Sequence, residues 1–342
     1  MGAVIPKKVK EADVTRYLAE MGFLRTYQGK TRDMYDLGDY LLIVASDRLS
    51  IFDFVLPVLV PKKGEVLTAL THFWLTSVLS DFPNHLLPSE NDADLNAVHD
   101  LKERYPELPL QRCLVVKKVN ILDDEMILRH HIGGSVYKNY LATGMAGGHK
   151  LTPDLPKWSK LDKPIFTPST KAEIGHDVNY DAVAFFNKHG KNGHKIVNML
   201  MAAYMTAYAF AEKRGILILD TKFEGDYTML ADEVLTPDSS RFCDAEDWTR
   251  AMKEGREPQF KDKEPVRIFG KKIVTPFENN DGSIVGINKL EPTDPKHLSW
   301  IAALTFPDDI IRITTRRYLE ILQRLTKKDL PEYQKEDMKI VA

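Results

Sequence analysis

The sequence predicts an α+β protein whose N-terminal part is rich in strands. Residues 24–46 contain extended runs with a turn at Gly38, and the apolar run 40–45 is typical of a strand that is buried on both faces. Residues 66–77 then carry apolar side chains at helical spacing. The chain of 342 residues is long enough for about two domains. A sheet that comes before the first long helix favours an α+β fold with a strand-rich first lobe.

The rest of the chain alternates between helices and strands. We expect strands at 113–119, 125–129, 216–223 and 227–234, and helices at 13–21, 135–142, 180–188, 194–214, 248–254 and 310–325. The polar link 120–124 predicts a boundary between two lobes, residues 1–119 and residues 120–342. Residues 143–168 are rich in Gly, Pro and Lys and predict a long loop. Residues 257–295 are charged and broken by Gly and Pro, so we expect a surface elaboration there.

Composition excludes several classes of protein. The chain is 43% hydrophobic and 28% charged, which is ordinary for a globular protein and excludes a disordered or collagen-like chain. The 47 basic and 49 acidic side chains give a formal net charge of −2, so we expect no nucleic-acid partner. The longest nearly apolar stretch, residues 196–211, is shorter than the roughly 20 residues that cross a bilayer. We therefore expect no membrane partner.

Two further features favour a cytoplasmic location. Cys113 and Cys243 are the only cysteines, and their separation matches neither a disulfide framework nor a metal-binding CxxC pair. No apolar segment follows Lys7, Lys8 and Lys10, so we expect no secretory signal. The sequence does not indicate the oligomeric state.

The first candidate for binding chemistry is Gly29-Lys30-Thr31-Arg32, which lies between extended segments. A glycine lets the backbone approach a phosphate, and Lys30 and Arg32 would reach it from one strand face. The alternative is a hairpin turn with solvated charges, because the full GxxxxGK[ST] pattern is absent. Both interpretations stay open at this level.

Charged residues among aromatic ones mark a second candidate at residues 47–53. Asp47, Arg48, Ser50 and Asp53 lie within seven positions beside large apolar side chains. Buried charges need a partner or a ligand. The segment therefore either binds a ligand or forms a structural network around Asp47 and Arg48.

Acidic residues at two successive strands predict a magnesium site. Asp220, Lys222 and Glu224 alternate and so project from one face, and Asp232 follows on the next strand. Mg²⁺ takes one or two carboxylates and completes its shell with phosphate and water. A two-residue loop at 225–226 would place Asp232 about five residues from Glu224, too far for a shared ion. A shared ion therefore requires a wider loop, and the alternative is a surface hairpin with exposed charges.

Several other positions could hold an anion. Ser240 and Arg241 could clamp a phosphate, although an N-cap for the helix near Asp244 would also explain the hydroxyls. Arg129 ends a strand and Ser135 opens a helix, which is a natural anion site. The segment 171–177 combines acid, base and cation in a loop.

Five motifs occur in one order along the chain: GKTRDMYDLGDYLLIVASDRLSIFDFVLP, ILRHHIGGS, PSTKAEIGHD, LILDTKFE and DEVLTPDSSRF. Together they resemble the phosphoribosylaminoimidazole-succinocarboxamide synthase (SAICAR synthetase) family. The resemblance runs from about Gly29 to about Arg267 and resumes in the final helix. It implies a strand-rich lobe like the small lobe of protein kinases and a larger lobe related to ATP-grasp enzymes.

The resemblance also implies an activity. Members of the family join the carboxylate of carboxyaminoimidazole ribotide (CAIR) to the amine of L-aspartate, with conversion of ATP to ADP and phosphate. We expect an acyl phosphate intermediate, with ATP and Mg²⁺ as cofactors. A kinase-like phosphotransferase is the alternative enzyme, although the HRDxxxxN and DFG motifs are absent. A non-catalytic nucleotide-binding module is the third possibility.

The roles of individual residues follow from the resemblance alone. It implies nucleotide binding by Gly29, Lys30, Arg32 and Lys118; metal and phosphate binding by Glu224 and Asp232; a catalytic site of Lys222, Glu224 and Asp232; and substrate binding by Ser50, Asp53, Arg129, Ser135, His176, Asp177, Ser240 and Arg241. One departure concerns the residues after Glu224, where the usual Phe-Gly is replaced by Gly225-Asp226.

Overall fold

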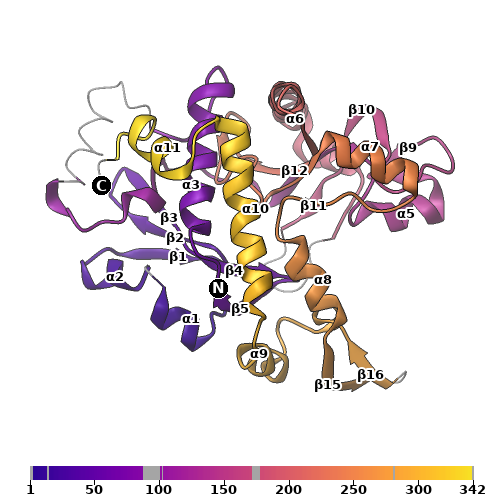
Figure 1. Ribbon diagram of the computed structural model, residues 1–342. Helices are drawn as coiled ribbons and strands as arrows, with labels where there is room; N and C mark the ends of the chain where they lie inside the picture. The colour runs from indigo at the N-terminus through magenta and orange to yellow at the C-terminus, as the bar shows by residue number, and fades with distance from the viewer. Residues whose placement is uncertain are drawn as a thin grey trace.

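A computed structural model describes residues 3–13, 15–87, 101, 103–171, 178–279 and 282–340. The strands within these ranges form two larger sheets and three two-stranded ribbons. Figure 1 shows helices α3 (Lys63–Phe73) and α10 (Asp308–Thr326) side by side in the middle of the molecule, with one larger sheet on each side of them. The two sheets are joined through these helices and through the extended segment 83–87, in which Asn84 forms a bridge with Leu230 of one sheet and Leu86 with Val116 of the other.

The first sheet comes from the N-terminal part of the chain and has the order β1-β2-β3-β6. Its strands are β1 (Arg25–Gln28), β2 (Arg32–Asp36), β3 (Tyr40–Ala45) and β6 (Cys113–Lys117), all antiparallel to their neighbours. The predicted turn is confirmed, since Gly38 has a φ of +80° and its N–H donates to the Asp36 carboxylate. The prediction that the third strand is buried is also confirmed for Leu42 to Ala45.

The second larger sheet has the order β10-β7-β12-β13, with β11 paired to β7 and β14 paired to β12. Its strands are β7 (Asp124–His131), β10 (Lys160–Phe166), β11 (Ser169–Thr170), β12 (Ile216–Gly225), β13 (Leu230–Ala231) and β14 (Ser240–Asp244). The ribbons are β4 (Arg48–Ile51) with β5 (Phe54–Leu59), β8 (Met145–Ala146) with β9 (His149–Lys150), and β15 (Val274–Asn279) with β16 (Gly282–Val285).

The helices pack around these sheets. The remaining ones are α1 (Lys7–Ala12), α2 (Thr15–Glu20), α5 (Val136–Thr143), α6 (Ala182–Glu212), α7 (Ala245–Glu254), α8 (Glu264–Lys272), α9 (Pro295–Ala302) and α11 (Leu330–Glu336). The two helices predicted at 180–188 and 194–214 form the single element α6, which is broken at Gly190, where φ is +55° and ψ is −139°. In the described part of the chain no helix is long and apolar enough to cross a bilayer.

Three expectations about the chain need correction. Residues 143–168 are not a long loop, because they contain the ribbon β8–β9 and the strand β10. The sequence of β10 does not show the alternation of a strand, because it contains exposed charges and Pro164. Pro164 cannot donate to the ladder and lies where the register shifts. The strand expected at 227–234 is reduced to Leu230–Ala231.

The third correction concerns residues 257–295, which we expected to be a surface elaboration. Val266, Ile287 and Leu290 are completely buried and pack in one apolar cluster with Leu49. The segment therefore supplies core to the β4–β5 ribbon. Its β15–β16 ribbon extends away from the rest of the fold (Figure 1).

Candidate active site

The glycine loop lies between β1 and β2 and is closed by its own backbone. The Gly29 N–H donates to the Arg32 carbonyl over 2.7 Å, and a Cβ at Gly29 would lie 2.6 Å from that oxygen. The close approach therefore requires glycine. Lys30 and Arg32 reach different partners: Lys30 Nζ lies 2.5 Å from the Asp53 carboxylate, whereas Arg32 reaches the acids after β13.

Those acids follow a hairpin that is wider than a two-residue turn. Glu224 on β12 pairs with Ala231 on β13, so residues 226–229 form the loop and Asp232 follows directly. The Asp226 carboxylate accepts hydrogen bonds from two backbone N–H groups of this loop, at 2.6 and 2.9 Å. An aspartate in this position stabilises a turn locally. The wider loop removes the geometric objection to a shared site of Glu224 and Asp232.

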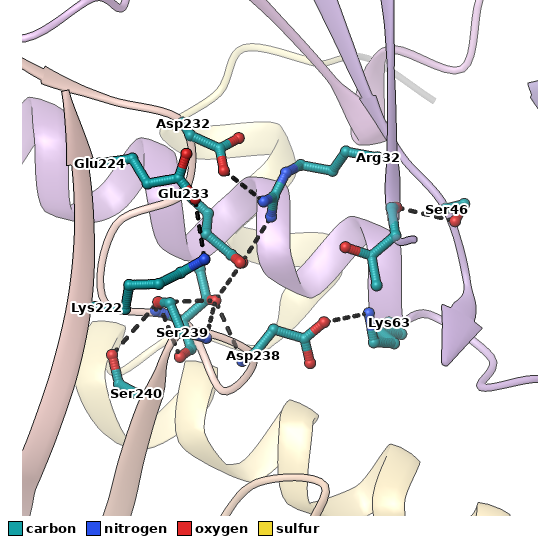
Figure 2. Close-up of polar contacts among 12 residues, drawn as sticks. Arg32, Ser46, Lys63, Lys222, Glu224, Asp232, Glu233, Asp238, Ser239 and Ser240 are labelled. Carbon is teal, nitrogen blue, oxygen red and sulfur yellow. Dashed lines mark hydrogen bonds and ion pairs between the residues drawn. The ribbon is translucent and has the colours of Figure 1, made fainter. Parts of the chain in front are cut away.

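Arg32 joins the first sheet to these acids. Its guanidinium lies 2.6 Å from an Asp232 oxygen and 2.7 Å from a Glu233 oxygen, as Figure 2 shows. Burial raises the pKa of the Asp232 carboxyl, Arg32 opposes this rise, and the charges of Glu224 and Glu233 add to it. The second oxygen, Asp232 Oδ1, is buried and accepts no hydrogen bond from the residues that the structure describes. The site therefore contains a carboxylate that a further cation would stabilise.

Glu224 lies between two lysines. Lys222 Nζ is 2.9 Å from one of its oxygens, and Lys171 Nζ is 2.5 Å from the other. Burial opposes ionisation of Glu224, but the two ammonium groups lower its pKa well below the usual value. Lys222 also contacts Glu125 over 2.8 Å. Burial opposes its charge too, yet the two carboxylates raise its pKa well above the usual value, so Lys222 is a fixed cation and not a base.

Two arginines converge beside the start of α5. Arg129 on β7 and Arg241 on β14 each lie 2.5 Å from the Asp220 carboxylate on β12. A Cβ at Gly134 would lie 3.0 Å from Arg241 Nη1 and 3.1 Å from Arg129 Nη1. Ser135 Oγ is 3.5 Å from Arg129 Nη2. Two cations share one carboxylate next to a helix N-terminus, so the place suits an anion.

The hydroxyls near Arg241 do not cap a helix. Ser240 lies on β14, and its Oγ is 2.8 Å from Thr221 Oγ1 on the neighbouring strand. Helix α7 starts after Asp244, whose side chain makes no capping hydrogen bond. The capping interpretation is therefore wrong, and Ser240 shares a strand with Arg241.

The segment 47–53 divides into a structural part and a half-buried turn. Asp47 accepts hydrogen bonds from Arg112 at 2.7 and 2.9 Å, and Arg48 is completely buried with an oxygen of Asp33 at 2.5 Å. Both residues therefore have structural partners, but Asp47 pairs with Arg112 and Arg48 with Asp33, and not with each other. Asp53 lies in the two-residue turn of the β4–β5 ribbon with a φ of +69°, where it meets Lys30.

The remaining predicted residues lie apart from the acids or outside the described ranges. Ser50 is buried on β4 opposite Val55. Lys118 follows β6 and forms an exposed ion pair with Asp36 over 3.0 Å. His176 and Asp177 lie outside the described residues.

Comparisons with known proteins identify the family. The family model described as SAICAR synthetase matches residues 25–282. The phosphoribosylaminoimidazole-succinocarboxamide synthase of Thermodesulfovibrio yellowstonii is 38% identical over 304 residues, which are 87% of this chain and 94% of that protein. The chain belongs to the SAICAR synthetase family. The enzyme of the same name from Mannheimia succiniciproducens is 37% identical over 91% of this chain and its own whole length.

Solved structures agree with this SAICAR synthetase assignment. The SAICAR synthase from Saccharomyces cerevisiae, complexed with SAICAR, has a TM-score of 0.71 and 29% identity, and the match covers 90% of this chain and 96% of that chain. A SAICAR synthetase in complex with ADP has a TM-score of 0.57 at 19% identity and shows the fold alone. The chain is therefore a carbon–nitrogen ligase by family, as the motifs predicted.

The predicted residues have three further partners, of which only Glu125 was not singled out from the sequence. Lys171 and Glu125 contact Glu224 and Lys222, and Asp220 holds the two arginines. Asp220 had a signal in the alternation along β12. Glu125 had none, because its approach to Lys222 depends on the register between β7 and β12.

A magnesium ion at this site would have few protein ligands. Among the described residues, no group of three or more His, Cys, Asp or Glu side chains could hold a metal ion. Mg²⁺ needs only one or two carboxylates when phosphate and water complete its shell. Asp232 meets that need through its buried and unpaired Oδ1. Both oxygens of Glu224 are held by Lys222 and Lys171, so Glu224 would bind the ion only by exchanging one of these lysines.

Proposed function

We propose that this chain joins CAIR to L-aspartate at the site where Arg32, Lys222, Glu224 and Asp232 meet, and that it converts ATP to ADP and phosphate. Family membership supports the reaction. The observation that supports the site is the meeting of two carboxylates from the β12–β13 hairpin with cations from both sheets. A carboxylate is a poor electrophile, so such a site suits its activation by a phosphoryl group.

The bond changes follow from the chemistry of the substrates. An oxygen of the CAIR carboxylate attacks the γ-phosphorus of ATP, and the bond to ADP breaks. The aspartate amine then attacks the acyl carbon of the acyl phosphate, inorganic phosphate leaves, and the amine loses a proton to form the amide. Negative charge develops on phosphoryl oxygens in the first step, so cations fixed in advance lower its barrier.

The nucleotide side of the site is assigned to the first sheet. Gly29 would let the backbone approach the phosphates, and Lys30 and Arg32 would contact them. Lys118 would lie on the adenine side. Glu224 and Asp232 would hold Mg²⁺, which neutralises phosphoryl charge when it is bound. In this assignment residues 1–119 are the kinase-like nucleotide lobe and residues 120–342 the ATP-grasp-related lobe.

The ribotide is assigned to the anion site beside α5. Arg129 and Arg241 can form charge-assisted hydrogen bonds with its phosphate, and Ser135 and Ser240 lie next to them. Lys222, which contacts Glu125 over 2.8 Å and Glu224 over 2.9 Å, would face the carboxylate that is activated. The assignment of Ser50, Asp53, His176 and Asp177 to the cleft for CAIR and aspartate stays a prediction, as does the cytoplasmic location.

The test is the substrate requirement for ADP release. We expect ADP only when ATP, Mg²⁺, CAIR and L-aspartate are all present, with the succinocarboxamide as the second product in equal amount. Coupled ADP detection together with mass spectrometry of the product measures both. ADP formation with an alcohol acceptor and without aspartate would support the kinase-like alternative. ATP binding without any turnover would support the non-catalytic module.

A further inference from the structure

A buried carboxylate at the start of β7 organises a second polar cluster. Asp124 accepts hydrogen bonds from the Tyr180 hydroxyl over 2.6 Å, from Lys188 Nζ over 2.7 Å and from His189 Nε2 over 2.8 Å. Its side chain is only 3% exposed and that of His189 only 6%. Burial opposes the charge of Asp124, but the donors hold its pKa below the usual value. Asp124 is therefore an ionised, rigidly held acceptor.

The cluster continues to the hairpin that carries the acids. His189 Nδ1 lies 2.7 Å from the Tyr227 hydroxyl. An ionised carboxylate only accepts hydrogen bonds, so His189 Nε2 carries the proton toward Asp124. In the neutral imidazole Nδ1 is then an acceptor, and the Tyr227 hydroxyl donates to it. The three groups form one hydrogen-bonded chain.

Tyr227 occupies the loop between the two proposed metal ligands. Residues 226–229 connect Glu224, which pairs with Ala231, to the strand that precedes Asp232. Helix α6 breaks at Gly190, directly after His189. The loop is therefore fastened at its tip to a buried group on another element.

We propose that His189 and Tyr227 are positioning residues that fix the hairpin and so set the placement of Glu224 and Asp232 for the metal and nucleotide. The proposal rests on the metal assignment made under the proposed function. It goes beyond that assignment because neither residue would touch a substrate or the ion. Loss of the connecting hydrogen bond should loosen metal binding without affecting the arginine site.

The chain offers a matched pair of variants for the test. Tyr227→Phe and Tyr180→Phe each remove one hydroxyl from the same Asp124 cluster, but only Tyr227 lies on the hairpin. The readout is Mn²⁺ binding at saturating ADP. The electron paramagnetic resonance signal of free Mn²⁺ measures this binding. We expect Tyr227→Phe to weaken Mn²⁺ binding by about 3- to 10-fold, as for one lost net hydrogen bond, and Tyr180→Phe by less than about 2-fold.

Two further measurements complete the test. The KM for ATP should rise in Tyr227→Phe while the KM for CAIR stays within about 2-fold of wild type. In a His189→Gln background, Tyr227→Phe should cause no further loss, because the two residues act through one hydrogen bond. Equal effects of Tyr227→Phe and Tyr180→Phe, or no effect of Tyr227→Phe, would overturn the proposal.

Asp232→Asn separates this proposal from the proposed function. If Asp232→Asn abolishes Mn²⁺ binding and Tyr227→Phe leaves it unchanged, the metal assignment stands and the positioning role is wrong. If Asp232→Asn also leaves Mn²⁺ binding unchanged, the metal assignment fails and the positioning role fails with it.

Discussion

Arg129 and Arg241 both form an ion pair with one carboxylate, that of Asp220. The three side chains come from β7, β14 and β12, and both guanidinium groups approach Gly134 at the start of α5. Asp220 carries one negative charge against the two positive charges of the arginines, and Asp262 and Glu264 act on Arg241 as well. In the proposed assignment a phosphate would accept hydrogen bonds from both arginines.

At the residue scale we predict that Arg241→Ala mainly raises the KM for CAIR. The arginine supplies a charge-assisted hydrogen bond worth about 1.5–3 kcal/mol, which corresponds to an increase of about 10- to 150-fold. Steady-state kinetics with each substrate varied in turn measures the effect. Arg250→Ala, on the exposed side of α7, is the control and should leave the KM values unchanged. A rise confined to the KM for ATP would contradict the assignment of Arg241.

At the scale of elements, the β12–β13 hairpin shows how turn chemistry decides a site. A two-residue loop would separate Glu224 from Asp232 along the sheet. The Asp226 side chain instead closes a loop of residues 226–229 through two backbone hydrogen bonds. Gly225-Asp226, which replaces the family's usual Phe-Gly, therefore forms a loop that leaves Glu224 opposite Ala231, the residue before Asp232.

The glycine loop between β1 and β2 provides a prediction at the same scale. In Gly29→Ala the new Cβ would lie 2.6 Å from the Arg32 carbonyl oxygen, so the turn must open and Arg32 must move. We expect the KM for ATP to rise by about 5-fold or more, because a displaced Arg32 would form a weaker hydrogen bond with a phosphate of ATP. The KM for CAIR should stay unchanged. Kinetics and thermal unfolding measure the two effects.

Gly38→Ala is the control in the same sheet. Gly38 has a φ of +80° and no atom within 4 Å of an added Cβ. Its replacement should lower the free energy of unfolding by about 1 kcal/mol and leave the KM for ATP unchanged. If both variants changed the KM for ATP equally, the effect would come from sheet stability and not from the loop.

At the scale of the whole molecule, buried histidines make stability depend on pH. Burial lowers the pKa of His85 to about 4, and burial together with the neighbouring charges of His130 and Lys160 lowers that of His131 to about 3. The unfolded chain has the ordinary value of 6.5. As the pH falls below 6.5, the unfolded state therefore takes up protons first, so stability is full above 6.5 and decreases toward the folded pKa values.

We predict that His131→Phe reduces this acid sensitivity. His131 is completely buried and its ring lies edge-on to Trp248, so phenylalanine keeps an aromatic contact. Between about pH 7.5 and about pH 5 the free energy of unfolding should fall by about 2 kcal/mol less than in wild type. Urea unfolding at the two pH values measures it. Parallel pH profiles of variant and wild type would contradict the buried, neutral state of His131.

The secondary structure that the sequence predicts correctly depends on patterns among neighbouring residues. The strands of the first sheet, the turn at Gly38 and helix α10 follow from periodicity and turn residues that lie next to one another in the chain. Strand β10 and the apolar cluster of Val266, Ile287 and Leu290 could not be predicted, because their burial depends on partners far away in sequence.

The family, the α+β class and the residue types of the proposed site follow from the order of the amino acids, because these depend on ordered motifs and on local alternation. The contacts between these groups follow from the folded arrangement: Arg32 with Asp232, Lys171 with Glu224, and both arginines with Asp220. Such contacts join residues between 21 and 200 positions apart. They depend on strand order and register, which no local pattern records.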